Sequence, residues 1–213
     1  MRHQISLLIA AGLISTLAIC LPGRLTRAET AVPPKAPSVA AKPGPSVVES
    51  LPAQKKLLDE LFTRLAKSTD PQESQGIAGA IQRVWMRSGS DTADLLMGRA
   101  LSAVQAKQLA LAEKLVSSVI GVEPEWAEAW NKRATIRFMN DDEAGAMQDI
   151  AEVLRREPRH FGALVGMGSI LQQAGLKKAA LKVYRKALEI YPQQANVRSA
   201  VEKLTIEVEG RDI

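Results

Sequence analysis

The chain has 213 residues and a formal net charge of +5, which is enough length for one domain with flanking segments. Aromatic residues make up only 4 % of it, so we expect a core built mainly from aliphatic side chains. Residues 1–28 contain three arginines and no acid, and the rest of the chain holds 25 basic against 23 acidic residues, a net charge of only +2. So small a surplus disfavours a nucleic-acid-binding protein.

The N-terminal segment has the pattern of an export signal. Arg2 and His3 precede an uncharged, mostly apolar run from Ile5 to Leu21, and Thr26 and Ala28 occupy the small-residue positions of a cleavage site. We therefore predict a secretory signal peptide over residues 1–28, cut after Ala28. This prediction implies an exported, periplasmic protein.

An uncleaved signal anchor is the alternative. The apolar run of residues 5–21 is short for a membrane span, but Arg24 and Arg27 beyond it resist translocation and favour an inner-membrane anchor. Cys20 is the only cysteine, and Ile19 stands before it where a lipoprotein cleavage site normally has a small residue, which disfavours lipidation. If the signal is removed, the mature chain has no cysteine for disulfides or thiol chemistry.

Residues 29–50 differ in composition from the remainder of the chain. They contain five prolines and many alanines and serines, without an apolar period. Such a segment cannot bury enough apolar surface to offset the entropy of ordering it. We predict a semi-extended linker between the export signal and the folded domain.

Beyond residue 50 the sequence is periodic. Two sets of residues recur every 34 positions: Pro124, Pro158 and Pro192, and Ala112, Ala146 and Ala180. Two independent markers with this period predict a solenoid of helix–turn–helix units. The units run over 93–126, 127–160 and 161–194, and residues 51–92 form a degenerate N-terminal helical repeat in which Ser90 replaces the proline.

Both ends of the array show amphipathic helices. Apolar residues between Leu57 and Leu65 form the stripe of a first helix, which the sequence DPQES at 70–74 interrupts. Residues 195–213 begin with a second such stripe, which predicts a C-terminal capping helix that Gly210 ends, followed by a short tail.

The units resemble tetratricopeptide repeats. The unit 161–194 carries the residues of that pattern at Leu164, Met167, Gly168, Leu171, Ala180, Tyr184, Ala187 and Pro192. The unit 127–160 departs from the pattern at Arg133 and Arg137, and the unit 93–126 departs at Arg99. The resemblance implies an all-α fold, a right-handed α-solenoid of antiparallel helix pairs.

Arg133 and Arg137 stand where this family buries apolar residues. We expect their stems to pack while their charged heads reach carboxylates, with Asp141, four residues after Arg137, as one candidate. The alternatives are a structural ion network that joins neighbouring units and a specific binding site.

Few residues could carry catalysis. Beyond residue 28 the only histidine is His160, in a turn between units, and we expect a surface or packing role for it. The acidic stretch at 140–145 lacks the alternating oxygen ligands of a calcium loop and is predicted to cap a helix. No phosphate loop, metalloprotease or dinucleotide motif is present. We predict no enzymatic activity, no cofactor and no metal site.

The resemblance also implies a concave groove, lined by the first helix of each unit, that holds a peptide. At the corresponding positions the chain has Met97, Leu101, Val104, Asn131, Lys132, Thr135, Phe138, Val165 and Ser169. Some relatives clamp a C-terminal carboxylate with several basic and amide side chains over three units. Only Asn131 and Lys132 could do so here, so we predict no carboxylate clamp.

The sequence thus predicts an exported scaffold or adaptor that binds a protein or peptide segment in its groove, without catalysis and without nucleic acid. It would touch a membrane only through an uncleaved N-terminal segment. The alternative is a cell-envelope assembly component that uses its convex face. Residues 177–189 form a basic amphipathic helix with Lys178, Lys182 and Arg185 along one face, which we interpret as a solvated surface.

Overall fold

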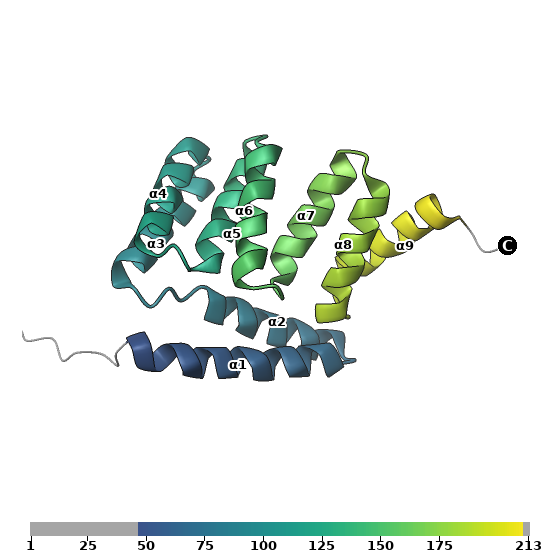
Figure 1. Ribbon diagram of the computed structural model, residues 1–213, viewed down its shortest axis with the longest axis horizontal. Coiled ribbons are helices and arrows are strands. Elements are labelled where there is room, and N and C mark those ends of the chain that lie inside the picture. The colour runs from purple at the N-terminus through teal and green to yellow at the C-terminus, as the bar shows by residue number, and fades with distance from the viewer. Residues whose placement is uncertain (1–46, 211–213) are drawn as a thin grey trace, which may run out of the picture. The chain divides into compact units, whose positions relative to one another are not determined.

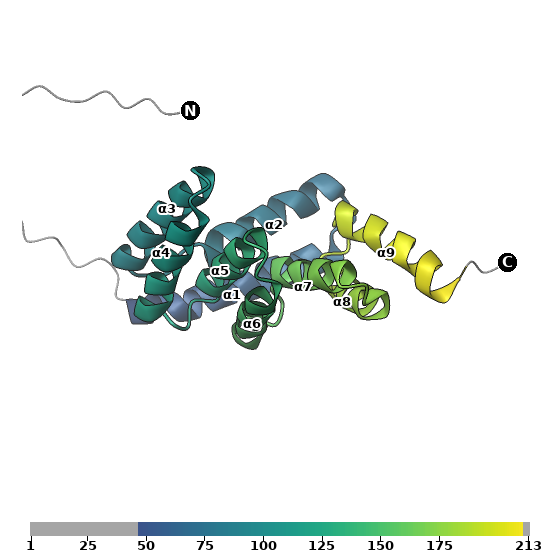
Figure 2. The ribbon, with the colours of Figure 1, turned by 90° about the horizontal axis from the view of Figure 1, so that it is seen from above.

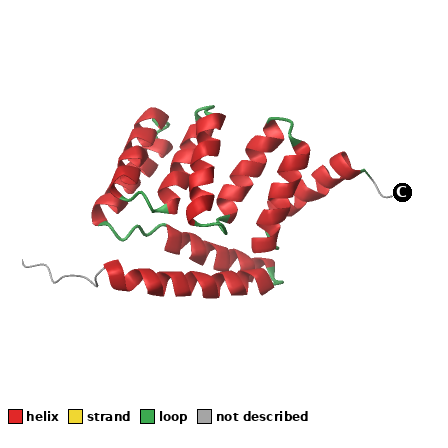
Figure 3. Ribbon diagram, in the orientation of Figure 1, coloured by secondary structure: helices red, strands yellow, loops and turns green. Residues whose placement is uncertain are grey.

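The computed structural model describes residues 47–210 as helices joined by short turns, with no strand in that range (Figures 1 and 3). The helices are α1 (Val47–Lys67), α2 (Pro71–Trp85), α3 (Asp91–Gln105), α4 (Leu109–Val122), α5 (Ala127–Met139), α6 (Glu143–Arg156), α7 (Phe161–Gln173), α8 (Lys177–Ile190) and α9 (Ala195–Glu209). The predicted all-α solenoid of helix pairs is confirmed. The predicted signal peptide, including Cys20, and the linker up to residue 46 lie outside the described residues, while residues 47–50 already belong to α1.

The turn inside each of the three central units is the same. One residue there has a left-handed backbone, and these residues are again 34 positions apart: Lys107 (φ 58°), Asp141 (φ 59°) and Gly175 (φ 76°). In each unit the amide after it donates to a carbonyl five residues back, for example Asp142 to Arg137 at 2.9 Å, which ends the first helix in a Schellman-type motif. Asp142 then caps α6 through a side-chain bond from the Gly145 amide, so the cap prediction for residues 140–145 is confirmed.

Small residues allow the two helices of each unit to pack closely. Ala112, Ala146 and Ala180 are completely buried on the second helices. On the first helices the facing position is Ala100, Ala134 or Gly168. Gly168 faces Tyr184, and a Cβ atom on Gly168 would lie 2.5 Å from the tyrosine ring. Of the three units, the one with glycine at this position of the first helix is thus also the one with an aromatic residue at the facing position of the second helix.

The helix pair α1–α2 does not stack as a further repeat. Within the described chain it packs on α7 and α8, and α2 does not pack along α3, contrary to what a repeat over 51–92 implies (Figures 1 and 2). Its apolar face meets the turns that link the units: Trp85 contacts Phe161 at a ring distance of 5.2 Å, and Tyr191 belongs to the same core. Arg159 reaches Asp59 at 2.7 Å and covers the ring of Phe62.

The C-terminal helix α9 closes the other end. Val197 and Leu204 are buried against α8, in the same core as Ala180 and Leu181. The exposed side of α9 is mostly polar, and Gly210 ends the helix with φ 86°. These features are those of a terminal unit that shields an apolar face from water.

Candidate binding groove between α5 and α7

A hollow of about 320 Å³ lies between α5 and α7, with α6 at its base. We call it the α5–α7 groove; its walls are Asn131, Ala134, Thr135, Phe138, Ile150, Gly162, Ala163, Val165, Gly166, Ser169 and Ile170. Asn131, Thr135 and Phe138 follow the i, i+4, i+7 spacing of one helical face, which brings them to the same wall. Gly162 and Gly166 leave room on the opposite wall.

Five of the nine residues predicted for the groove line this hollow: Asn131, Thr135, Phe138, Val165 and Ser169. Lys132 lines a second hollow of about 220 Å³ beside it, which shares Asn131 and Gly162. Gln82 and Trp85 of α2, with Met86 directly after it, form a wall of this second hollow. The folded-back α1–α2 pair therefore contributes to the candidate site.

Three predicted residues lie elsewhere. Met97 is only 2 % exposed and belongs to the core of the unit 93–126, so its predicted place on an exposed groove wall is wrong. Leu101 and Val104 are half-buried against the same core and line neither of the two hollows. The reason is chemical: an apolar side chain at this edge gains by burial, whereas Asn131 at the position of Met97 does not.

A buried carboxylate organises the polar end of the groove. Glu128 is 5 % exposed and accepts hydrogen bonds from Lys132 Nζ (2.6 Å), Asn131 Nδ2 (3.1 Å) and His160 Nε2 (3.0 Å). Burial alone would raise the pKa of Glu128, but the His160 hydrogen bond and the charge of Lys132 outweigh it and lower the pKa. Glu128 is thus ionised and neutralises Lys132.

His160 holds the common edge of the two hollows in place. Its Nδ1 accepts from the Ala163 amide at 3.1 Å and so caps α7, which assigns the ring proton to Nε2, the atom that donates to Glu128. The ring stacks on Trp85 at 4.1 Å with an angle of 7°. The predicted packing role is confirmed. The pairing with Trp85 has no signal in the sequence, whereas the i, i+4 spacing of Glu128 and Lys132 could have suggested their ion pair.

Arg133 and Arg137 form an ion network rather than reaching Asp141. Arg133 binds the buried Asp149 with two hydrogen bonds, at 2.9 and 2.7 Å, and Arg137 binds the same carboxylate at 3.0 Å. The partner suggested for Arg137 was therefore wrong, because Asp141 lies in the left-handed turn and the nearer aspartate there is Asp142, at 3.8 Å.

The same network crosses between units. Arg133 donates to Ser117 at 3.2 Å and Arg137 to Glu113 at 2.9 Å, and both acceptors lie on α4 of the preceding unit. Burial opposes the charge of Arg137, yet the Glu113 hydrogen bond and the charge of Asp149 raise its pKa. The alternative interpretation of these arginines, an ion network joining neighbouring units, is the one that the structure shows.

The basic helix α8 is partly neutralised by α9. Arg185 bonds both carboxylate oxygens of Glu209, at 2.7 and 2.9 Å, and Lys177 pairs with Glu207 at 3.0 Å. Lys178 and Lys182 remain exposed. This face therefore carries less uncompensated positive charge than the sequence of α8 alone implies.

Two other kinds of site are absent from the part of the chain that the structure describes. It contains no group of three histidine, cysteine or acidic side chains placed to hold a metal ion. None of its helices combines the length and the apolar character that a membrane crossing requires.

Antiparallel helix pairs stacked with a 34-residue period define a helical-repeat protein, a class that presents extended binding surfaces. A tetratricopeptide repeat family model matches residues 144–195. A TPR repeat-containing protein of Rhizobium etli is 38 % identical over 156 residues, which cover 73 % of this chain and 76 % of that protein. The chain therefore belongs to the tetratricopeptide repeat family.

Solved structures share the fold at low identity. The TPR domain of Arabidopsis OM64 aligns with a TM-score of 0.53 and 19 % identity, over 55 % of this chain and 98 % of that one. The first TPR of Spaghetti (RPAP3), bound to the HSP90 peptide SRMEEVD, gives 0.53 and 17 %, over 56 % and 95 %. MamA gives 0.52 and 14 %, over 74 % and 86 %.

Proposed function

We propose that this protein is an exported, non-catalytic scaffold that binds a segment of a partner protein in the α5–α7 groove. The observation that carries the proposal is an apolar hollow of about 320 Å³ with a few polar groups along one edge, which is the usual composition of a binding site. One structural neighbour, the first TPR of Spaghetti (RPAP3), is bound to an HSP90 peptide. Tetratricopeptide folds commonly act as scaffolds for protein–protein interaction.

The groove favours an apolar anchor over an acidic tail. Lys132, which lines the hollow beside the groove, already pairs with the ionised Glu128, so the groove and this hollow offer no uncompensated positive charge to a carboxylate. Phe138, Val165 and Ile170 instead offer apolar surface to a side chain of the partner. We infer a partner segment with a large apolar residue and no cluster of acids.

A variant that fills the groove tests this function. Gly166 lines the hollow, and a Cβ atom there would meet only Ile150, at an ordinary 3.6 Å, so Gly166→Leu should occupy the groove without disturbing the core. Gly121→Leu is the matched control, because Gly121 is also helical and exposed, with nothing within 4 Å of an added Cβ. Both changes raise helix propensity by about 1 kcal/mol, so neither should reduce stability.

Affinity purification of the tagged protein from intact cells, followed by mass spectrometry, provides the readout. We expect the wild type and Gly121→Leu to retain the same partner proteins. Gly166→Leu should lose them, and so should the double variant Phe138→Ala with Lys132→Ala. A partner that Gly166→Leu still retains would show that the groove is the wrong surface. Sequencing the N-terminus of the mature protein tests export and cleavage after Ala28 against the inner-membrane anchor.

The alternative is a cell-envelope assembly component that acts through its convex basic face. Lys178, Lys182 and Arg185 line a hollow of about 530 Å³ beside α9, which supports this alternative, although Glu209 compensates one of the three charges. Charge reversal at Lys178 and Lys182 separates the two functions. It should leave capture by the groove unchanged and abolish an interaction made by the convex face.

A further inference from the structure

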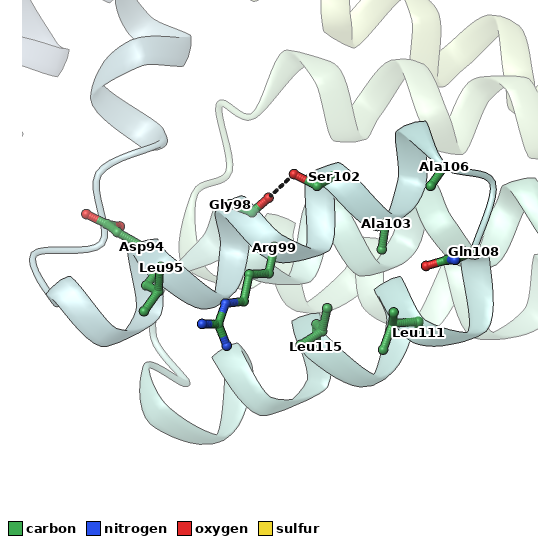
Figure 4. A pocket seen from close by; sticks show the side chains of 10 residues that line it. All are labelled: Asp94, Leu95, Gly98, Arg99, Ser102, Ala103, Ala106, Gln108, Leu111 and Leu115. Carbon is green, nitrogen blue, oxygen red and sulfur yellow. Dashed lines mark hydrogen bonds between the residues drawn. The ribbon is translucent and has the colours of Figure 1, made fainter.

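A second apolar surface lies at the N-terminal end of the repeat array. We call it the α3–α4 end face and define it by Leu95, Arg99, Ser102, Leu111 and Leu115, which line an open hollow of about 760 Å³ (Figure 4). Leu95 is 58 % exposed and Leu111 47 %. Exposed apolar side chains that form one continuous patch, unlike apolar residues scattered singly, mark interaction sites.

The 34-residue period relates residues of this face to buried residues in the later units. Leu95, Ser102 and Leu115 are equivalent to Ala129 (0 % exposed), Ile136 (2 %) and Asp149 (1 %) in the next unit. Ala129 and Ile136 are buried there in a core that Val116, Val119 and Ile120 of α4 help to form. The same positions in the third unit, Ala163 and Ile170, are buried against residues of α6.

The end face is therefore a stacking surface without its preceding unit. In both later units the second helix of the preceding unit packs on the first-helix part of this surface. The α1–α2 pair is the segment that would do so here, but it packs on the turns at α7 and α8. Among the described residues no helix packs over this end of the array.

The charge of Arg99 indicates which side chain a helix bound to this face would supply. Arg99 is equivalent to Arg133, which bonds Asp149 within its unit and Ser117 on the covering helix. The counterpart of Asp149 beside Arg99 is Leu115, and within the described residues Arg99 has no ion pair. A covering helix that supplies a carboxylate would complete this arrangement.

We propose that the α3–α4 end face docks an amphipathic helix of a partner protein, with apolar side chains on Leu95, Leu111 and Leu115 and an acidic residue opposite Arg99. This contact would reproduce the way α4 covers α5 in the same molecule. It is independent of the α5–α7 groove.

A second copy of the chain fits less well. Two end faces brought together would bury arginine without a new carboxylate, because Asp94 on this face is already held by the amide and hydroxyl of Ser88, at 3.2 and 2.6 Å. At the other end of the array, the exposed side of α9 carries Ile206 among Arg198, Glu202 and Lys203.

The test uses a defined probe, a helix-stabilised peptide with the α4 sequence 109–122 and a Ser117→Glu change, which places the carboxylate where Arg99 should meet it. Its dissociation constant for the purified full chain is measured by fluorescence anisotropy. We expect Leu111→Glu to weaken binding about tenfold or more and Arg99→Gln about fivefold. Ile206→Glu, on a residue of similar exposure (52 %), is the control and should leave binding unchanged.

Two comparisons make the result decisive. The peptide with the native Ser117 should bind the wild type about fivefold more weakly, and Arg99→Gln should not weaken it further, because the ion pair is then absent. Equal binding by all protein variants, or no binding by the wild type, overturns the proposal. A wild-type dimer in solution that Leu111→Glu dissociates also overturns it, because a second copy then covers this face. All the substituted side chains are exposed, so circular dichroism should show unchanged melting.

Discussion

The close contact between Gly168 and Tyr184 predicts that a larger residue at position 168 destabilises the repeat core. Adding one methyl group by Gly168→Ala would place Cβ 2.5, 2.7 and 2.9 Å from three ring atoms of Tyr184. These are atoms of a buried, rigid ring rather than the end of a flexible side chain, so the helices must separate.

The magnitude results from two opposing effects. Overpacking of this severity costs about 3 kcal/mol, at the upper end of the usual range. Replacing a helical glycine by alanine returns about 1 kcal/mol of helix propensity. We therefore expect Gly168→Ala to lower the free energy of unfolding by about 2 kcal/mol.

The unit 127–160 supplies a matched background for the same change, because Ala134 and Ile150 occupy these two positions there. In a Tyr184→Ile background the clash is gone, so Gly168→Ala should stabilise by about 1 kcal/mol, a coupling of about 3 kcal/mol between the sites. Urea denaturation followed by circular dichroism measures all four proteins. If alanine at position 168 destabilises both backgrounds equally, helix approach does not limit this position and the reasoning fails.

Three further predictions concern stability. Asp149→Ala leaves both arginines of the ion network without their shared carboxylate and should cost about 3–5 kcal/mol in urea denaturation, whereas a similar loss from the control Asp141→Ala would contradict the network. The pKa of Glu128 is lower in the folded than in the unfolded state, so ionised Glu128 stabilises the fold fully above the ordinary pKa of 4.5. This stabilisation is lost as the pH falls through the folded pKa, so between pH 5 and 3 the free energy of unfolding should fall more steeply for the wild type than for Glu128→Gln. Equal slopes for the two proteins would refute this. Lys107→Gly relieves a left-handed backbone and should raise stability by about 0.5–1 kcal/mol, while Gly175→Ala should lower it by about 1 kcal/mol; thermal melting that reverses either sign would refute the strain argument.

The repeat period predicted the central fold closely because each unit is a local structure. The units 127–160 and 161–194 begin where α5 and α7 begin, and most of the groove residues on these two helices line one hollow. Positions within a unit are related by helical spacing, which a sequence displays directly.

Contacts between distant segments could not be predicted in this way. The sequence shows that α1 and α2 are amphipathic but not which surface their apolar faces meet, and nothing in it indicates that Trp85 stacks on His160. Arg133 was placed correctly at a core position, yet its partner Asp149 depends on how α5 and α6 face each other. The prediction for Met97 was wrong for a related reason. Helical spacing places Met97 at a groove position, but its side chain can turn into the core where no close neighbour prevents it.

The folded-back helix pair also fixes an order of events during folding. In an array of neighbour contacts, each unit can form as soon as it is synthesised. The surface that receives α1 and α2 instead includes Phe161 and Tyr191, and the ion pair between Asp59 and Arg159 spans 100 residues. Closing so long a loop is slow compared with forming a local helix pair. The part of the apolar surface of α1 and α2 that does not pack within the pair must therefore stay exposed until almost the whole chain has been synthesised.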